Sequence, residues 1–317
     1  MKSLACIIIM VVLPVACSTP KNEGREAILV NEPVLTGLSG RTYFLPTWPA
    51  DTKVRLEESL RVARDSFNIN PREENYIWLG RRQAYLYQYK DAIATFTSGL
   101  QRYPQSYRLL RHRGHRYITL RQFDLAIADF QKAAQLMKGK PLETEPDGQP
   151  NALNQPLSTT QFNVWYHLGL AHYLKGNWAE AEKAYQACLA VCQNDDSAIA
   201  VTDWLYMTYQ RQGKKEEAQQ LLAGLKKNPV IIENDSYWRR LRFYLEEIPV
   251  DSVLTVNTGA EDADLSLATQ GYGVGNWYFY QGDTARAREI FERVVAGNYF
   301  SAFGFIAAEA ELARLPE

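Results

Sequence analysis

Residues 165–189 read WYHLGLAHYLKGNWAEAEKAYQACL, and this stretch decides the fold. The small residues Gly169 and Ala181 stand where two helices would approach each other closely, and Gly176 stands where a turn would join them. The aromatic Tyr185 would fill the gap between one such hairpin and the next. Because a pair of short helices cannot bury both of its faces alone, this pattern predicts hairpins that stack on one another.

The same pattern recurs towards the N-terminus. Residues of three different types each recur there 34 positions later, as Gly80 and Gly114 show. The further pairs at that offset are Ala92 with Ala126 and Phe96 with Phe130. A period of about 34 residues is typical of a helix-turn-helix repeat.

These motifs resemble the tetratricopeptide repeat family. The resemblance implies an all-α fold, a right-handed α-α superhelical solenoid over residues 51–317, and a binding function. His172 departs from the family pattern, which usually has Tyr there, and Tyr206 stands where a small residue is usual. The predicted units are 73–106, 107–140, 162–195, 199–232, a degenerate unit at 233–266, and 268–300, followed by a terminal helix at 301–315.

The spacing between the units is uneven. The distance from Ala126 to Ala181 exceeds one period, which places an insertion at residues 138–160. An insertion of this length is either functional or a disordered bulge, because long loops are uncommon in compact folds. A useful observation would be whether the insertion covers the concave surface of the solenoid.

The N-terminal segment has the features of an export signal. Residues 1–17 combine Lys2 with an apolar run, and residues 13–18 read LPVACS, which resembles a bacterial lipobox with its cysteine at Cys17, although Pro14 stands where Leu is usual. The resemblance implies lipidation of Cys17 and a location in the bacterial cell envelope, anchored to a membrane. Ordinary signal cleavage is the alternative. Residues 18–50 are rich in Pro and Gly and are predicted to form a tether.

With a formal net charge of −1 the chain as a whole does not attract polyanions, and we predict no nucleic-acid partner. The charge is nevertheless uneven. Residues 76–121 hold nine basic residues and only one acid, Asp91, which gives this region a local charge of +8. Such asymmetry creates a local positive field.

First helices of tetratricopeptide units line the concave groove, so the resemblance places several polar side chains there. Arg108, Arg111 and His115 share one helix face. The full set of candidate ligand-binding residues is Arg81, Arg108, Arg111, His115, Tyr166, Tyr173 and Asp203. Arginine forks suit carboxylates and phosphates, so a basic groove that binds an anion is one interpretation, and a solvated basic face is the other.

Arg113 and Arg116 occupy positions where the family packs Leu and Ala, and we predict that both are buried. A buried arginine is costly without a carboxylate partner. The candidate partners are Asp91, Asp124 and Asp129.

Motifs for chemistry are scarce. The histidines lack metal-ligand spacing, and no nucleophile, phosphate-loop or dinucleotide motif is present, so we predict no metal, no cofactor and no catalytic residue. Cys188 and Cys192 lie one helical turn apart and are expected to pack rather than to form a disulfide.

We therefore expect a non-enzymatic envelope scaffold that binds a protein or peptide, acidic or presenting a carboxylate, in a basic groove. Capture of a small anionic ligand by a lipid-anchored protein is one alternative. An enzyme whose site is not visible in the sequence is the other.

Overall fold

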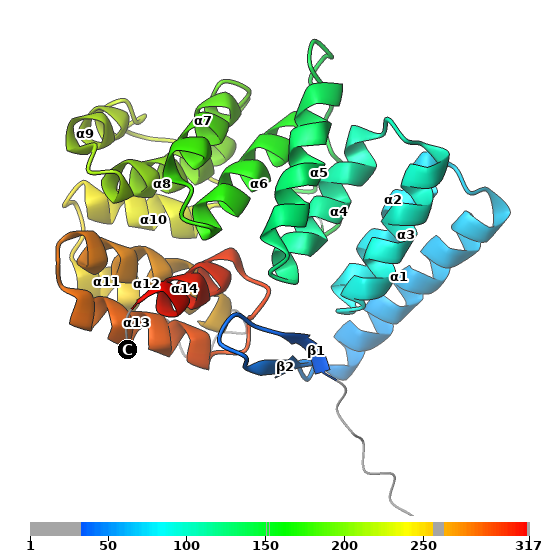
Figure 1. Cartoon of the computed structure of the whole chain (residues 1–317), viewed down its shortest axis with the longest axis horizontal. Coiled ribbons are helices and arrows are strands. Elements are labelled where there is room, and N and C mark those ends of the chain that lie inside the picture. The colour runs from blue at the N-terminus through cyan, green and yellow to red at the C-terminus, as the bar shows by residue number, and fades with distance from the viewer. Residues whose placement is uncertain (1–32, 150, 152, 256–262, 316–317) are drawn as a thin grey trace, which may run out of the picture. The chain divides into compact units, whose positions relative to one another are not determined.

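The computed structural model describes residues 33–149, 151, 153–255 and 263–315 (Figure 1). These residues form helices packed as successive hairpins, preceded by one β-hairpin, and they confirm the all-α solenoid expected from the sequence. The first strands and helices are β1 (Pro33–Thr36), β2 (Thr42–Phe44), α1 (Ala50–Ile69), α2 (Glu73–Tyr85), α3 (Tyr89–Arg102), α4 (Tyr107–Thr119), α5 (Phe123–Leu136), α6 (Thr160–Leu174) and α7 (Trp178–Leu189). The remaining helices are α8 (Asp195–Arg211), α9 (Lys215–Ala223), α10 (Asp235–Tyr244), α11 (Val250–Leu254), α12 (Ala263–Tyr280), α13 (Thr284–Ala296) and α14 (Phe303–Arg314).

Four of the repeats are closed by a glycine on the first helix and an aromatic ring on the second. A Cβ atom added to Gly114 of α4 would lie 2.8 Å from the ring of Phe130 on α5. The corresponding pairs are Gly80 with Phe96, Gly169 with Tyr185, and Gly275 with Phe291. In the α8–α9 hairpin the sizes are exchanged, since Tyr206 and Leu222 occupy these positions and both are buried. The hairpins are therefore held by matched volumes, as expected for close-packed interiors.

Three closely spaced glycines in α12 serve two different neighbours. A Cβ on Gly271 would lie 2.8 Å from Val294, and one on Gly275 would lie 2.6 Å from Phe291, both on α13. Gly273 instead faces α10, where a Cβ would lie 3.0 Å from the Nε atom of Arg240. Close approach on two sides explains why α12 accommodates residues that weaken an isolated helix.

The turns of the first two repeats differ from most of the later ones. Tyr87 and Arg121 adopt φ values of 62° and 61°, in the left-handed region, where three later repeats use Gly176, Gly213 and Gly282 and the degenerate unit has Glu246 at 60°. Residues other than glycine rarely adopt this backbone conformation without compensating contacts. Arg121 donates from Nε to Glu309 Oε2 at 2.8 Å and from Nη2 to the carbonyl of Phe300 at 2.8 Å. Tyr87 packs on the ring of Phe300 with centroids 5.4 Å apart, so both turns contact the C-terminal segment.

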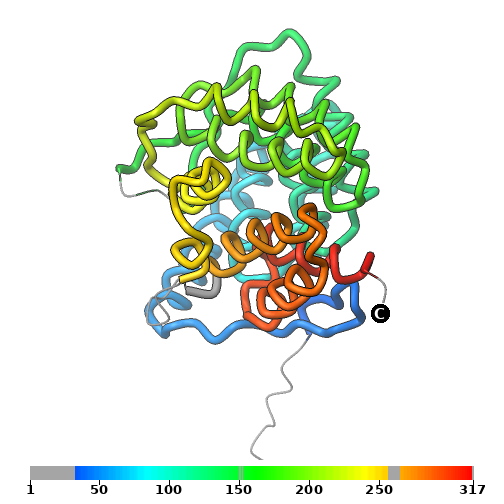
Figure 2. Tube along the Cα trace, turned by 90° about the vertical axis from the view of Figure 1, so that its left-hand side faces the viewer, coloured from blue at the N-terminus to red at the C-terminus, as the bar shows by residue number. Residues whose placement is uncertain are grey.

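The β-hairpin lies against the same C-terminal segment, as the blue strands beside the orange and red helices of Figure 2 show. The Tyr43 hydroxyl donates a hydrogen bond to Glu309 Oε1 at 2.9 Å, and its ring stacks on Phe300 with centroids 5.1 Å apart. The prediction of a tether at 18–50 is therefore wrong for residues 33–44, because these turn back and pack. Residues 18–32 and the predicted signal at 1–17, including Cys17, lie outside the described residues.

The C-terminal half contains the degenerate unit and the terminal helix. The second helix of the degenerate unit, α11, is only five residues long and follows Pro249. Helix α14 packs against α12 and α13 and also reaches α6. Its central residues are buried, among them Phe305 and Ile306. It therefore does more than cover an exposed end, because it also contacts earlier repeats.

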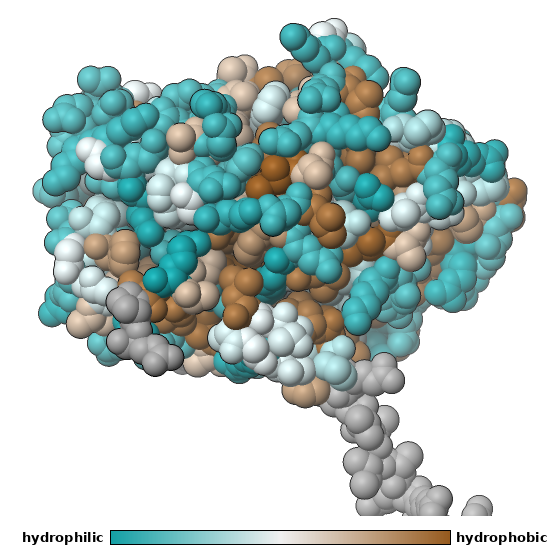
Figure 3. All heavy atoms as spheres, in the orientation of Figure 1, coloured by the Kyte–Doolittle hydropathy of each residue, from teal (hydrophilic) through white to brown (hydrophobic). Residues whose placement is uncertain are grey.

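The outer helix faces are largely hydrophilic in the view of Figure 3, with apolar side chains gathered in the recesses between elements. Amphipathic helices of this kind place their apolar stripes inward. Within the described ranges, no helix combines the length and the apolar character required to cross a bilayer.

Candidate functional site

The insertion at 138–160 is positioned by the start of α6. The amide of Glu145 donates to the carbonyl of Ser158 at 2.9 Å, and the amide of Thr160 donates to the carbonyl of Glu143 at 2.8 Å. Gln161 of α6 adds two bonds, because its Oε1 accepts from the amide of Glu143 and its Nε2 donates to the carbonyl of Pro141. The segment around Glu143 is consequently held in an extended conformation.

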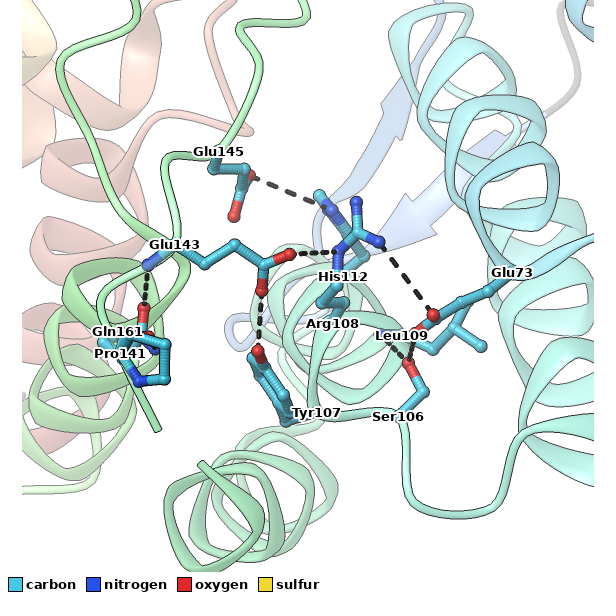
Figure 4. A network of polar contacts seen from close by, with 10 residues as sticks. All are labelled: Glu73, Ser106, Tyr107, Arg108, Leu109, His112, Pro141, Glu143, Glu145 and Gln161. Atoms are coloured by element: carbon cyan, nitrogen blue, oxygen red, sulfur yellow. Dashed lines mark hydrogen bonds and ion pairs between the residues drawn. The ribbon is translucent and has the colours of Figure 1, made fainter. Parts of the chain in front are cut away.

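The two glutamates of this segment point at α4 (Figure 4). Glu143 accepts a hydrogen bond from the Tyr107 hydroxyl at 2.6 Å, and its Oε1 lies 3.7 Å from Arg108 Nε. Glu145 Oε1 lies 2.9 Å from Arg111 Nη2. Residues two apart in an extended chain lie on one side, which is how both carboxylates reach the same helix.

The backbone of the segment then reaches α2. Arg81 Nη1 donates to the carbonyl of Pro146 at 2.8 Å, and Arg82 Nη1 donates to the carbonyl of Gly148 at 2.9 Å. Gly148 is buried against Tyr85, and a Cβ there would overlap the Tyr85 hydroxyl and lie 2.6 Å from Arg81 Nη2. We call the surface formed by Arg81, Arg82, Arg108 and Arg111 the basic face.

Several buried polar atoms of the basic face and of the segment on it lack hydrogen-bond partners within the described part of the chain. Arg111 Nε, Glu145 Oε2 and Asp147 Oδ2 are buried and have no hydrogen-bond partner among the described residues. Burial lowers the pKa of Arg111, and Glu145 opposes that shift. Burial and then the nearby Arg111 hold the pKa of His112 well below its usual range, so this histidine is neutral. Four carboxylates, those of Glu73, Glu143, Glu145 and Asp147, lie around the four arginines, so the shortfall is in hydrogen bonds rather than in charge.

Arg113 and Arg116 have different surroundings. Arg113 forms a bidentate pair with Asp129, one of the three carboxylates considered from the sequence, at 2.8 and 2.7 Å. Arg116 has no ion pair among the described residues and lies over the ring of Tyr89, 5.6 Å from its centroid. Burial lowers the pKa of Arg116 to about 10. The expectation of a carboxylate partner is therefore wrong for Arg116, which an aromatic ring accommodates instead.

The other predicted groove residues lie in packed surroundings. His115 is enclosed between His167, at 4.5 Å between ring centroids, and Phe303 of α14, at 5.4 Å. The hydroxyls of Tyr166 and Tyr237 are 3.1 Å apart, and Tyr173 accepts from Tyr272 at 2.7 Å.

Asp203 is fully buried and pairs with Arg240 of α10. The structure therefore brings Arg81, Arg108 and Arg111 together on one face with the insertion. It buries Tyr166, Tyr173 and Asp203 beneath later helices, and it packs the partly exposed His115 against His167 and Phe303.

Sequence reasoning missed the acidic side of this arrangement. Glu143, Glu145 and Asp147 form a short acidic run inside the insertion. That run follows a strongly basic repeat, and this proximity of opposite charges was the signal available. Among the residues that the structure describes, no cluster of His, Cys, Asp and Glu could hold a metal ion. Cys188 and Cys192 are free thiols.

Comparisons with known proteins identify the repeats. Two family models described as tetratricopeptide repeat match residues 162–195 and 271–296. No curated protein matches the chain. The chain therefore carries tetratricopeptide repeats, which are generally protein-interaction modules rather than catalytic ones.

Solved structures similar to this chain include a tetratricopeptide repeat protein from Parabacteroides merdae ATCC 43184. It is 15% identical with a TM-score of 0.44, over 83% of this chain and 94% of that one. YrrB, described as a tetratricopeptide protein with an unusual peptide-binding site, is 15% identical with a TM-score of 0.42, over 79% of this chain and 97% of that one. A mutant of MamA is 16% identical with a TM-score of 0.39, over 54% and 87%.

Proposed function

We propose that this tetratricopeptide-repeat protein is a non-enzymatic scaffold that binds an extended acidic segment of a partner protein on the basic face. The observation that carries the proposal is the way the chain's own residues 143–148 lie there. Arg111 takes a carboxylate, and Arg81 takes a backbone carbonyl. The arginine fork suits a carboxylate, and its N–H groups also donate to backbone carbonyls.

A protein segment fits this face better than a compact solute does. Contacts are spread over two helices, from Arg108 on α4 to Arg82 on α2, so an occupant must span several residues. Recognition through backbone carbonyls combined with alternate side chains is a general mode of binding for extended peptides. A hollow of about 530 Å³ lies beside Glu143 and is lined by Tyr107, Arg108 and Lys140 among others.

The test is calorimetric titration of the full chain with a glutamate-rich nonapeptide and with its glutamine counterpart, at low and high salt. Arg111→Gln is expected to lower the affinity for the acidic peptide about tenfold, because it removes a charge-assisted pair. Arg64→Gln is the matched control, because Arg64 is exposed on α1, away from the basic face. Equal binding of the two peptides, or unchanged binding by Arg111→Gln, contradicts the proposal.

Arg116 favours a second candidate, a small anion bound next to the basic face. Its guanidinium has no carboxylate partner among the described residues, and Arg111 and Arg81 lie near enough to lower its pKa further. Thermal denaturation with citrate and phosphate, compared with chloride at equal ionic strength, tests this candidate. Specific stabilisation that Arg116→Gln abolishes supports it, and equal effects of all three salts contradict it.

The proposed location is the bacterial cell envelope, with lipidation at Cys17. The support is the LPVACS sequence after an apolar run. Labelling of cells with a palmitate analogue is expected to mark the wild-type protein and to spare Cys17→Ala. Absence of label on the wild type contradicts the anchor.

A further inference from the structure

Residues 143–148 lie on the basic face in the manner of a bound peptide. Their backbone is extended, since Thr144 forms an antiparallel bridge with Thr159. Glu143 and Glu145 face α4, and the carbonyls of Pro146 and Gly148 then accept hydrogen bonds from the arginines of α2. The segment therefore presents carboxylates first and backbone acceptors second.

Apolar burial contributes little to holding this segment in place. From Pro141 to Gln149 the buried residues are Glu145 and Gly148, whereas the apolar residues Pro141, Leu142 and Pro146 are exposed. The hydrophobic effect scales with the apolar area removed from water, so it stabilises the segment only weakly. Ion pairs and hydrogen bonds hold it, and water or another acidic chain can replace such contacts.

The contacts are also unfinished. Arg111 Nε on the helix and Glu145 Oε2 on the segment are both buried, and neither has a partner among the described residues. An occupant with a slightly different backbone could satisfy more of the donors on α4 than the insertion does. The insertion therefore occupies the basic face without satisfying all of its buried hydrogen-bond donors.

We infer that residues 143–148 are an internal ligand of the basic face, and that a partner segment with two carboxylates two residues apart replaces them. The inference rests on the proposed function for the chemistry of the competitor. The insertion keeps the basic face covered until such a segment is present. A partner binds at the expense of the internal contacts, so its apparent affinity is reduced by the fraction of molecules in which the face is open.

The experiment supplies the internal segment in trans. A labelled peptide with the sequence of residues 141–149, PLETEPDGQ, is titrated by fluorescence polarisation into the full chain. Glu143→Gln/Glu145→Gln weakens the internal ligand and is expected to bind the peptide about tenfold more tightly than wild type. Glu216→Gln/Glu217→Gln changes the net charge equally on the exposed surface of α9, and is expected to bind as wild type does.

A second variant displaces the segment without changing charge. Gly148→Ala adds a methyl group against Tyr85 and Arg81, so it is also expected to bind the peptide more tightly than wild type. Near-equal affinities of wild type, Glu143→Gln/Glu145→Gln and Gly148→Ala overturn the internal ligand and leave the proposed function standing.

Failure of all four proteins to bind overturns the proposed function instead. In that case amide exchange of Glu145 decides the remaining part of the inference. Faster exchange in Glu143→Gln/Glu145→Gln than in wild type supports a segment held by charge, and unchanged exchange overturns it.

Discussion

Two arginine–carboxylate pairs in this molecule have the same chemistry, but among the described residues only one of them makes a hydrogen bond from every guanidinium nitrogen. In the interior, Arg240 donates from Nε to Asp203 at 2.9 Å, adds a second bond to the same carboxylate, and donates from Nη1 to the carbonyl of Thr269 at 2.7 Å. On the basic face, Arg111 binds Glu145 through Nη2 while its Nε has no partner among the described residues. The first pair joins α8, α10 and α12, whereas the second joins a helix to a loop.

This difference separates structural charge from exchangeable charge. A buried pair repays its desolvation only when every donor is satisfied. Each of the three guanidinium nitrogens of Arg240 donates a hydrogen bond, and the rings of Tyr237 and Trp204 lie against the group, at 5.0 and 5.8 Å from their centroids. The carboxylate of Glu145 comes from a segment with little apolar burial, so this pair can open without unfolding the repeats. The predictions that follow test this contrast.

The largest effect is expected from Asp203→Asn. Removing one charge leaves Arg240 buried and uncompensated, which costs about 3–5 kcal/mol. The free energy of unfolding, measured by urea denaturation, reports this loss. The exposed control Glu217→Gln is expected to change stability by less than about 0.5 kcal/mol. A loss below about 1 kcal/mol for Asp203→Asn would mean that the interior pair is not a structural element.

A somewhat smaller effect is expected from Glu309→Gln. This carboxylate accepts bonds from Arg121, from Tyr43 and from the amide of Leu38. Its loss should cost about 2–3 kcal/mol, because it leaves the Arg121 guanidinium buried without its charge partner. Amide exchange is expected to rise in the β-hairpin and in α14 together. A rise in only one of them would show that the two ends are not coupled through Glu309.

Acidification is expected to destabilise the region around α4 and α6. Burial holds the pKa values of His112, His115 and His167 well below the usual value of 6.5. The unfolded chain therefore binds protons before the folded one does. Stability from these residues is fully present above about pH 6.5 and is lost as the pH falls towards their folded pKa values.

Thermal denaturation between pH 7.5 and 5.5 measures this loss. Each histidine contributes at most about 1.4 kcal/mol per pH unit in that window. His115→Phe keeps an aromatic ring beside Phe303 and is expected to reduce the dependence on pH. If His115→Phe retains the full pH dependence of stability, His115 does not contribute to the loss of stability on acidification.

The smallest effect on stability is expected from Glu145→Gln. Its partner Arg111 can be hydrated once the loop moves, so the cost should stay near 1 kcal/mol, well below that of Asp203→Asn. Urea denaturation of the two variants under the same conditions gives the comparison directly. Equal losses would contradict the distinction between the exchangeable and the structural pair.

The repeat pattern predicted the hairpins because their contacts are local. Gly114 and Phe130 lie in adjacent helices of one unit, so a fixed spacing reports their packing. The contact of Arg121 with Glu309 joins residues 188 positions apart, and no local period encodes such a contact.

For the same reason the register placed Tyr173 and Asp203 on inward helix faces without revealing that α10 and α12 cover them. The basic side of the candidate site was visible as a cluster of charge. Its occupation by Glu143 and Glu145 required the path of the loop.

The most direct test of the central claim is amide hydrogen exchange of the full chain during titration with the peptide PLETEPDGQ. The account predicts that the amides of Glu145 and Thr160, bonded to Ser158 and Glu143, exchange about tenfold faster at saturation. The helices around Arg240 should keep their protection. Unchanged exchange at Glu145 despite bound peptide, or a uniform rise that includes α10 and α12, would contradict it.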